Sequence, residues 1–156
     1  MLTLFKKNPM KHPWDKLYWT DVEQTGAIFA YAYKIAEVNM YDFVDKYMNS
    51  AVRECMDGWH AQYTNGPSDW VFDVCVECCG GFEPIDKSDS KQLMYPEEAR
   101  WIGMVYMVIR YYTSLTSSEI FKIAGLDTMR KWYHFGHEVS WDNFVNTVVA
   151  DEDTPS

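Results

Sequence analysis

The chain has 156 residues, which suits a single domain that buries roughly two thirds of the surface exposed by its unfolded chain. Its formal net charge of −9 at pH 7 argues against broad binding to nucleic-acid phosphates and favours a basic protein partner. Aromatic residues make up 17% of the chain, which is more than a small core readily hides, so we expect some of them on a contact surface.

Neither a membrane span nor a secretion signal is expected. No stretch approaches about 18 consecutive apolar residues, and the first residues lack an apolar run followed by a small-residue cleavage site. We therefore expect a cytoplasmic protein. The four cysteines are Cys55, Cys75, Cys78 and Cys79, and their uneven spacing is a poor framework for disulfides. Reduced thiols are the expectation.

The N-terminal part of the chain divides into an arm and a helix. Residues 1–19 carry four lysines and two prolines, and we expect them to form an irregular basic arm. Thr20 and Glu23 have the spacing of a capping box, in which the threonine is the N-cap of a helix. Apolar residues at helical spacing then predict that this helix runs to about Val38.

Two further helices are expected in the middle of the chain. The first covers 40–56, and Gly58 in a left-handed conformation is expected to end it. The second covers 69–79 and stops at the glycine pair that starts with Gly80. Proline and small polar residues make 82–94 the clearest loop.

The C-terminal half predicts four more helices. Pro96 suits the first turn of a helix over 96–113. The next helix starts at a capping box formed by Thr116 and Glu119 and ends at Gly125. The one after it is capped by Asp127 and stops at Gly136. The last helix is capped by Ser140 and covers 141–149.

Strand signals are sparse, so the sequence predicts an all-α fold. We expect a compact bundle of six or seven short-to-medium helices in a single domain over 20–150, followed by an acidic tail over 151–156.

Cysteine and histidine residues raise the possibility of a zinc site. Cys75 and Cys79 lie one helical turn apart, and His134 and His137 could complete a set of four ligands. However, the two thiols fall in a predicted helix beside valines, where cysteine packs like a small apolar side chain. We therefore expect no metal and no cofactor.

No catalytic motif is visible in the sequence. A cysteine nucleophile with a histidine base would be the enzymatic alternative, but nothing fixes which thiol would pair with which imidazole. Phosphate-binding glycine loops, serine elbows and paired HExxH histidines are absent from the sequence. We therefore expect a protein without enzymatic activity.

The segment 117–133 has the outline of a helix-turn-helix. Its three basic residues outnumber its two acidic residues by only one, which is little for a duplex contact in an acidic chain. A helical hairpin that serves the core is the favoured interpretation, and nucleic-acid binding is not expected. The residues that would contact DNA in the alternative are Lys122, Arg130 and Lys131.

Three blocks in the C-terminal half, EARWIGMVY, SSEIFKIA and MRKWYHFGHEVSWDNFV, resemble a family of small bacterial proteins of Firmicutes type. Members show an E-A-x-W-I-G-x-x-Y-R block, an S-S-K-E-I-type helix start and a Tyr-x-x-x-His-Thr block. The resemblance covers about two thirds of the chain and is most specific between Glu98 and Val145. The matching positions are Trp101, Ile102, Gly103, Tyr106, Ser118, Glu119, Tyr133 and His137.

This resemblance implies an antitoxin. Related proteins are often encoded beside toxins, including ADP-ribosyltransferase-like ones, so the implied partner is a protein that the chain neutralises without catalysis. Two positions depart from the pattern, because Met107 stands where the family usually has Arg and Glu138 where Thr is common. If that Arg contacts the partner, this chain binds differently.

The leading hypothesis is an inhibitor that covers a toxin or effector with a basic surface. Tyrosine, tryptophan and arginine are favoured at protein interfaces, and the predicted partner-binding residues are Trp101, Tyr106, Arg110, Trp132 and His137. Two alternatives stay open: an acidic nucleic-acid mimic, encoded by a phage or mobile element, that inhibits a defence enzyme, and a small DNA-binding regulator that uses the 117–133 hairpin.

Overall fold

The computed structural model of the chain describes residues 3–10, 16–58, 63 and 66–150. The described residues form a compact all-α domain, which confirms the predicted fold class, with eight α-helices where six or seven were expected. The helices are α1 (Lys16–Lys34), α2 (Met40–Met48), α3 (Ala51–Asp57), α5 (Ser68–Cys79), α6 (Pro96–Thr113), α7 (Ser117–Ile123), α8 (Leu126–Gly136) and α9 (Trp141–Val148). The shorter elements are β1 (Phe5–Lys6), the 3-10 turn η1 (Ser90–Gln92) and β2 (Val149–Ala150).

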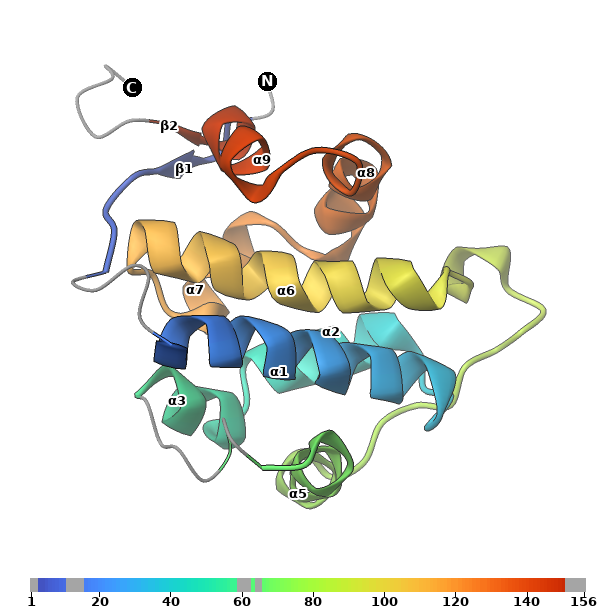
Figure 1. The fold of residues 1–156 in the computed structure, drawn as a ribbon. Helices are drawn as coiled ribbons and strands as arrows, with labels where there is room; N and C mark the ends of the chain where they lie inside the picture. Colours follow the sequence, from blue (N-terminus) through green and yellow to red (C-terminus); the bar gives the residue numbers. More distant parts are fainter. Residues whose placement is uncertain (1–2, 11–15, 59–62, 64–65, 151–156) are drawn as a thin grey trace.

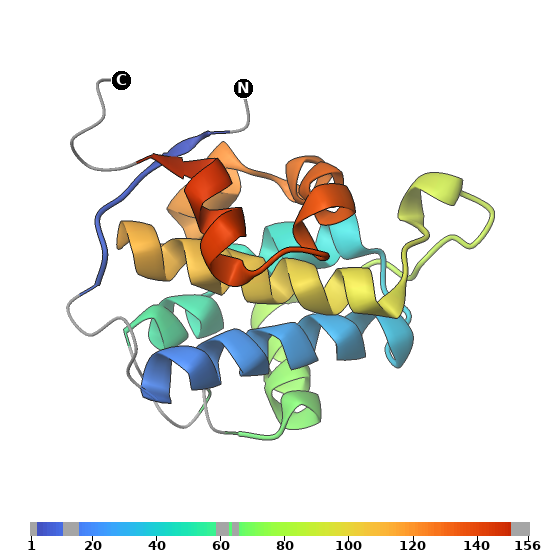
Figure 2. The same ribbon diagram turned by 45° about the horizontal axis from the view of Figure 1, so that its top comes forward.

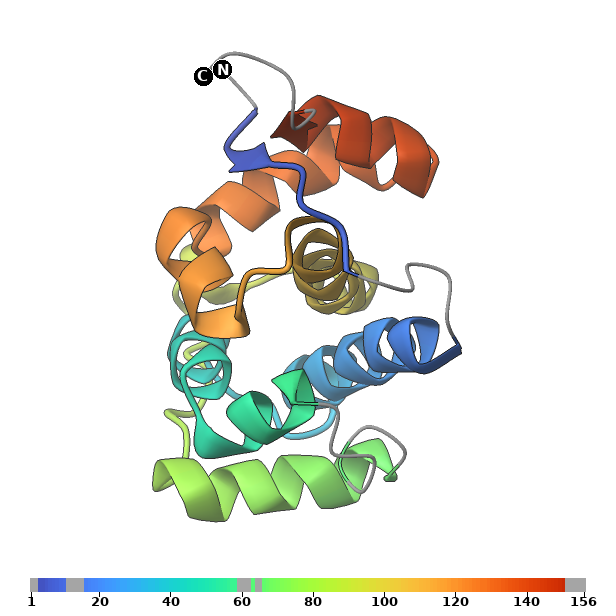
Figure 3. The ribbon, with the colours of Figure 1, turned by 90° about the vertical axis from the view of Figure 1, so that its left-hand side faces the viewer.

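Helices α1 and α6 form the centre of the domain, where they run side by side in opposite directions (Figure 1). Helices α8 and α9 cover one side of this pair, and α5 lies at the opposite end of the molecule (Figure 1). Seen from another side, α3 lies between α5 and α7 (Figure 3). None of the described helices is both long enough and apolar enough to cross a membrane.

Glycines allow α1 and α6 to approach closely. A Cβ atom on Gly103 would lie 2.7 Å from the carbonyl oxygen of Thr25 and 3.1 Å from the Cα atom of Gly26. Both neighbours are backbone atoms of α1, so they cannot move aside without moving the helix. A side chain at this position would force the central pair of helices apart.

The N-terminal arm is more ordered than the sequence suggested. Residues 5–6, within the segment expected to be irregular, pair in parallel with 149–150 (Figure 2). The next residues cover the end of α6: the Asn8 amide donates to the carbonyl of Tyr112 and the Met10 amide to that of Tyr111. The last carbonyls of a helix lack partners within it, which explains this contact. The expected acidic tail, 151–156, lies outside the described residues.

Two helix boundaries in the N-terminal half differ from the prediction. Helix α1 begins at Lys16, so Thr20 lies inside the helix and is not its N-cap. The helix expected over 40–56 is broken in two because Ser50 acts as an N-cap, its hydroxyl accepting a hydrogen bond from the Arg53 amide at 3.1 Å. A serine hydroxyl that caps a new helix competes with continuation of the old one.

Three glycine predictions near helix ends have different outcomes. Gly80 is left-handed with φ of 76°, as expected for a glycine that ends a helix. Gly58 is not left-handed, because its φ is −84°. Gly136 does not stop α8 but is its last residue, where a Cβ atom would lie 2.6 Å from Cζ2 of Trp101. Close packing, and not chain reversal, therefore requires a glycine at 136.

The capping signals of the C-terminal half are largely correct. Pro96 occupies the first turn of α6, the capping box of Thr116 and Glu119 is formed, and Ser140 caps α9. One cap is wrong: Gly125, and not Asp127, is the N-cap of α8. The local hydrogen-bonding signals were thus sufficient to place most helix starts in this half.

The close approach of α1 and α6 predicts that Gly103→Ala destabilises the fold. We expect the free energy of unfolding to fall by about 1–3 kcal/mol, the usual range for inserting a methyl group into a packed contact. Gly125→Ala is the matched control, because the nearest atom to its Cβ position lies 4.0 Å away and its φ of −72° suits alanine. Urea denaturation measures the free energy of unfolding of both variants. Equal losses in the two variants would contradict a close approach of α1 and α6 at Gly103.

Candidate functional site

Four of the five predicted partner-binding side chains lie in the interior. Trp101, Tyr106, Arg110 and Trp132 are all buried, and only His137 is exposed. The Tyr106 hydroxyl donates to the carbonyl of Ala124 at 2.9 Å, which ties α6 to the end of α7. Trp101, Tyr106 and Trp132 therefore form core contacts and do not present a surface to a partner, whereas the buried Arg110 lines the inner end of a pocket.

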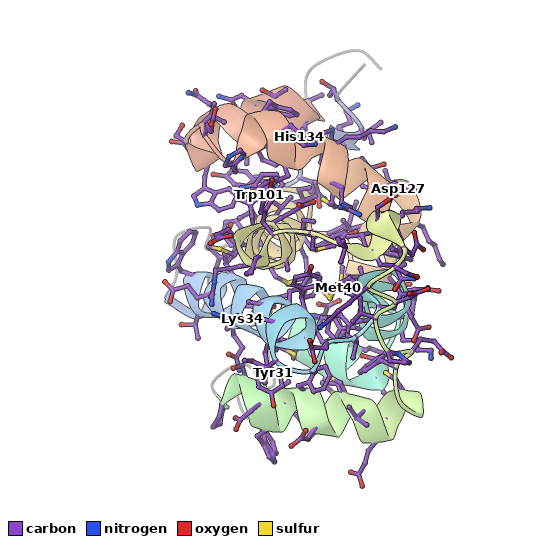
Figure 4. The ribbon with its side chains drawn as sticks, turned by 90° about the vertical axis from the view of Figure 1, so that its right-hand side faces the viewer. Tyr31, Lys34, Met40, Trp101, Asp127 and His134 are labelled. Carbon is purple, nitrogen blue, oxygen red and sulfur yellow. The ribbon has the colours of Figure 1, made fainter. Side chains whose placement is uncertain are left out.

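The two tryptophans belong to an aromatic cluster beneath α8 and α9. Trp101 lies between α6 and these helices (Figure 4), with its ring stacked on Trp141 at 6.2 Å and edge-on to Phe144 at 5.2 Å. Trp132 packs edge-on against Phe144 at 5.9 Å. Offset and edge-on aromatic pairs of this kind stabilise a core beyond the area they bury. The cluster fixes the two C-terminal helices on α6.

A buried network of ion pairs joins α3 to the central pair. Both guanidinium amino groups and Nε of Arg53 are engaged: Nη2 lies 3.2 and 3.0 Å from the two carboxylate oxygens of Asp21, Nη1 donates to Thr25, and Nε lies 2.9 Å from Asp57. Nε of Arg110 lies 3.0 Å from the same oxygen of Asp57. The network contains two positive and two negative side chains, so their charges balance.

The environment keeps both arginines charged. Burial alone lowers the pKa of Arg53, but the carboxylate of Asp21 and the other partners raise that pKa above its usual range. Burial lowers the pKa of Arg110, and the Asp57 carboxylate offsets part of this effect. Because guanidinium groups titrate far above neutral pH, both stay protonated. The Ser117 amide and hydroxyl also donate to Asp57, at 2.8 and 2.7 Å, which brings α7 into the network.

The zinc candidates do not come together. Cys75 and Cys79 lie on α5, whereas His134 lies on α8, and His137 directly after it, at the opposite end of the molecule (Figures 1 and 4). Within the described ranges, no group of three or more histidine, cysteine, aspartate or glutamate side chains could hold a metal ion. The fold therefore does not bring together the four side chains that were weighed as zinc ligands.

The same cysteines are poor candidates for a nucleophile. Cys75 is fully buried, and burial raises the pKa of its thiol to about 12. Burial also raises the pKa of Cys79, to about 11. Because the thiolate is the reactive form, both residues are held in an unreactive state at neutral pH.

The basic residues of the 117–133 hairpin do not form a common surface. Lys122 and Lys131 are exposed, but Arg130 is held by the rest of the fold. Its Nε lies 3.0 Å from a carboxylate oxygen of Glu98, and its Nη2 donates to the carbonyl of Leu93 at 2.6 Å. Arg130 therefore fixes α8 to the start of α6 and is not free to contact DNA.

Helix α5 presents the most distinctive exposed surface of the described chain. Its inner face packs on the body, where the ring of Phe72 lies 5.3 Å from that of Tyr31 on α1 (Figure 4). Its outer face carries Asp69, Asp73 and Glu77, all exposed and each four residues from the next. Residues four apart share one face of a helix, so the three carboxylates form a row.

No cation offsets this row from nearby in the sequence. From residue 54 to residue 86 the chain contains seven acidic residues and no lysine or arginine. Like charges four apart on a helix destabilise it by about 0.2–0.5 kcal/mol for each pair. A positively charged partner would relieve this repulsion.

A large aromatic side chain lies beside the acidic row. Trp70 is 45% exposed, and its ring stacks on Tyr63 with centroids 5.9 Å apart and planes 17° apart. The stack holds the indole in place while leaving nearly half of its surface open to solvent. We call Asp69, Trp70, Asp73 and Glu77 the α5 surface.

Comparison with known proteins adds no functional assignment: no family model, no curated protein and no solved structure matches the chain. The resemblance to an antitoxin-like family therefore stays a prediction, and function has to be argued from the surface of the molecule. Sequence reasoning missed the α5 surface, although two signals were present: the spacing of its acids and the long stretch without a basic residue.

The buried network predicts a large effect for Arg53→Ala. This change leaves the Asp21 carboxylate buried without its charged partner, so we expect the free energy of unfolding to fall by about 3–5 kcal/mol. The matched control is Lys46→Ala, which removes a partly exposed pair with Asp42 and should cost less than about 1 kcal/mol. Denaturant unfolding measures both, and a loss below 1 kcal/mol for Arg53→Ala would contradict a structural role of the network.

Proposed function

We propose that the chain is a non-enzymatic protein-binding inhibitor that covers a basic surface of its partner. We further propose that this partner is a toxin, so that the chain acts as an antitoxin by direct occlusion. The observation that carries the proposal is the α5 surface, a row of three exposed carboxylates beside a half-exposed tryptophan.

The charges of this surface suit the first stage of binding. An acidic patch attracts a basic partner over several ångströms and raises the rate of encounter. The stretch from residue 54 to residue 86, which lacks lysine and arginine, includes all of α5, so no basic side chain close in sequence weakens this attraction.

Trp70 suits the second stage, in which a complex becomes stable. Tryptophan is the residue type most often found to dominate the binding energy of protein interfaces, and charged side chains around it form the rim. Because Trp70 is already held by its stack on Tyr63, little side-chain freedom is lost when a partner covers it.

The acidic row also favours a second candidate function, inhibition of a nucleic-acid-binding enzyme by mimicry. Residues four apart on a helix are about 6 Å apart along its axis. Each strand of DNA carries a phosphate every 3.4 Å or so along the duplex axis, so both the strand and the acidic row present regularly spaced negative charges to a binding cleft. A chain that acts by mimicry would displace labelled DNA from the enzyme. An antitoxin that covers a cleft of another kind would not displace DNA.

Growth rescue tests the proposed function. We expect the reading frame next to the gene to arrest growth when expressed alone, and co-expression of the chain to restore growth. The triple variant Asp69→Asn, Asp73→Asn, Glu77→Gln should lose this rescue, because it removes the charge of the row with little change of shape.

The control for this experiment is a second triple variant, Glu23→Gln, Glu97→Gln, Glu138→Gln, at exposed positions on other helices or loops. Both triples change the formal net charge from −9 to −6, since each removes three negative charges. Equal rescue by both variants would remove the α5 surface from the proposal. A neighbouring product that is harmless by itself would refute the antitoxin function.

A further inference from the structure

A polar pocket of about 510 Å³ lies where the corner between α2 and α3 meets the end of α6 and the start of α7. Its walls come from two stretches of the chain that are distant in sequence, 48–58 and 110–118. The residues that matter for its chemistry are Asn49, Glu54, Asp57, Arg110 and Ser118. The pocket is separate from the α5 surface, although α3, which forms one of its walls, also packs against α5.

The charged groups at the inner end of the pocket balance one another. Asp57 is shared between Arg110 and Arg53, and Asp21 supplies the second negative charge of this network. With two charges of each sign, the network leaves no net charge facing the pocket. The remaining formal charge in the lining is therefore the carboxylate of Glu54.

Glu54 is free to bind a cation. Its side chain is exposed, and among the described residues its carboxylate forms neither a hydrogen bond nor an ion pair. In contrast to Asp57 on the same helix, the Glu54 carboxylate thus ties no other described residue to α3 by a hydrogen bond or an ion pair.

Two neutral acceptors are fixed in the same lining. The side-chain amide of Asn49 donates through Nδ2 to the backbone carbonyl of Asp45 at 2.7 Å and to its carboxylate at 3.2 Å. Its Oδ1 therefore points the other way and accepts a hydrogen bond from the Ser118 hydroxyl at 2.6 Å. A carbonyl oxygen has a second lone pair, and the Ser118 oxygen keeps its own, so both can accept a further hydrogen bond.

We infer that this pocket receives an arginine side chain from a protein partner. A guanidinium group has five N–H donors in a planar fork and no acceptor, which suits a lining with one free carboxylate and two fixed neutral acceptors. The inference rests on the proposed function in one respect, namely that the arginine belongs to a protein partner. It adds a second contact of defined chemistry to the charge attraction of the α5 surface.

A titration with N-acetyl-L-arginine amide tests the inference on the chain by itself. We expect saturable changes in the backbone amide NMR signals of Asn49, Glu54, Gly58 and Ser118, the residues around the pocket. Glu54→Gln should weaken this binding about tenfold, the effect expected for a charged hydrogen bond. Glu77→Gln, which removes the same charge from the α5 surface, should leave the binding unchanged.

The uncharged analogue N-acetyl-citrulline amide and N-acetyl-L-lysine amide complete the experiment. We expect both to bind more weakly than the arginine derivative, the first because it lacks the charge and the second because it lacks the fork. Binding of citrulline as tight as that of arginine would overturn the inference, and so would shifts along α5 or equal affinity in the two variants.

The outcomes for this pocket and for the proposed function can be told apart. Saturable arginine binding without growth rescue would support the pocket and refute the antitoxin function. Rescue without arginine binding at the pocket would refute the pocket and support the function. Because the Glu54 side chain is exposed and forms neither a hydrogen bond nor an ion pair with the described residues, an unchanged melting temperature of Glu54→Gln serves as the folding control.

Discussion

The ion-pair network of Asp21, Arg53, Asp57 and Arg110 is the interaction on which the arrangement of helices depends. It joins α1, α3 and α6, and Ser117 extends it to α7. Burying four charges costs much of what their attraction returns, so the network is weak evidence for high stability. We interpret its role as specificity: only one packing of these helices satisfies all four side chains. The position of α3, which together with α1 supports α5, follows from that packing.

Signals that act within a few residues could be read from the sequence. The capping box at Thr116 and the proline at the start of α6 are both present as expected. The break between α2 and α3 could not be read, because the apolar spacing continues across it and only the cap formed by Ser50 interrupts the helix. Periodicity reports which face is buried, but it does not report whether the backbone continues.

Candidate site residues were harder to predict because residue type alone does not separate core from interface. Aromatic side chains and arginine are enriched at interfaces, yet Trp101, Tyr106 and Arg110 serve the interior here. Their partners are far away in sequence: Arg110 binds Asp57, and Arg130 binds Glu98. The acidic face of α5 was more accessible to reasoning, since it depends only on helical spacing and on a count of charges. The pocket beside α3 required the tertiary structure, because two stretches about 50 residues apart in the chain build it.

The central claim is that a basic partner is attracted and bound through the acidic row of α5. The most direct measurement is the association rate constant of the chain with its partner at increasing salt concentration. Salt screens charge attraction over a distance of about 10 Å at 0.1 M. If the acidic row attracts the partner, this rate constant falls steeply with salt for the native chain. It depends much less on salt for the variant Asp69→Asn, Asp73→Asn, Glu77→Gln. The same salt dependence for both proteins would contradict the central claim.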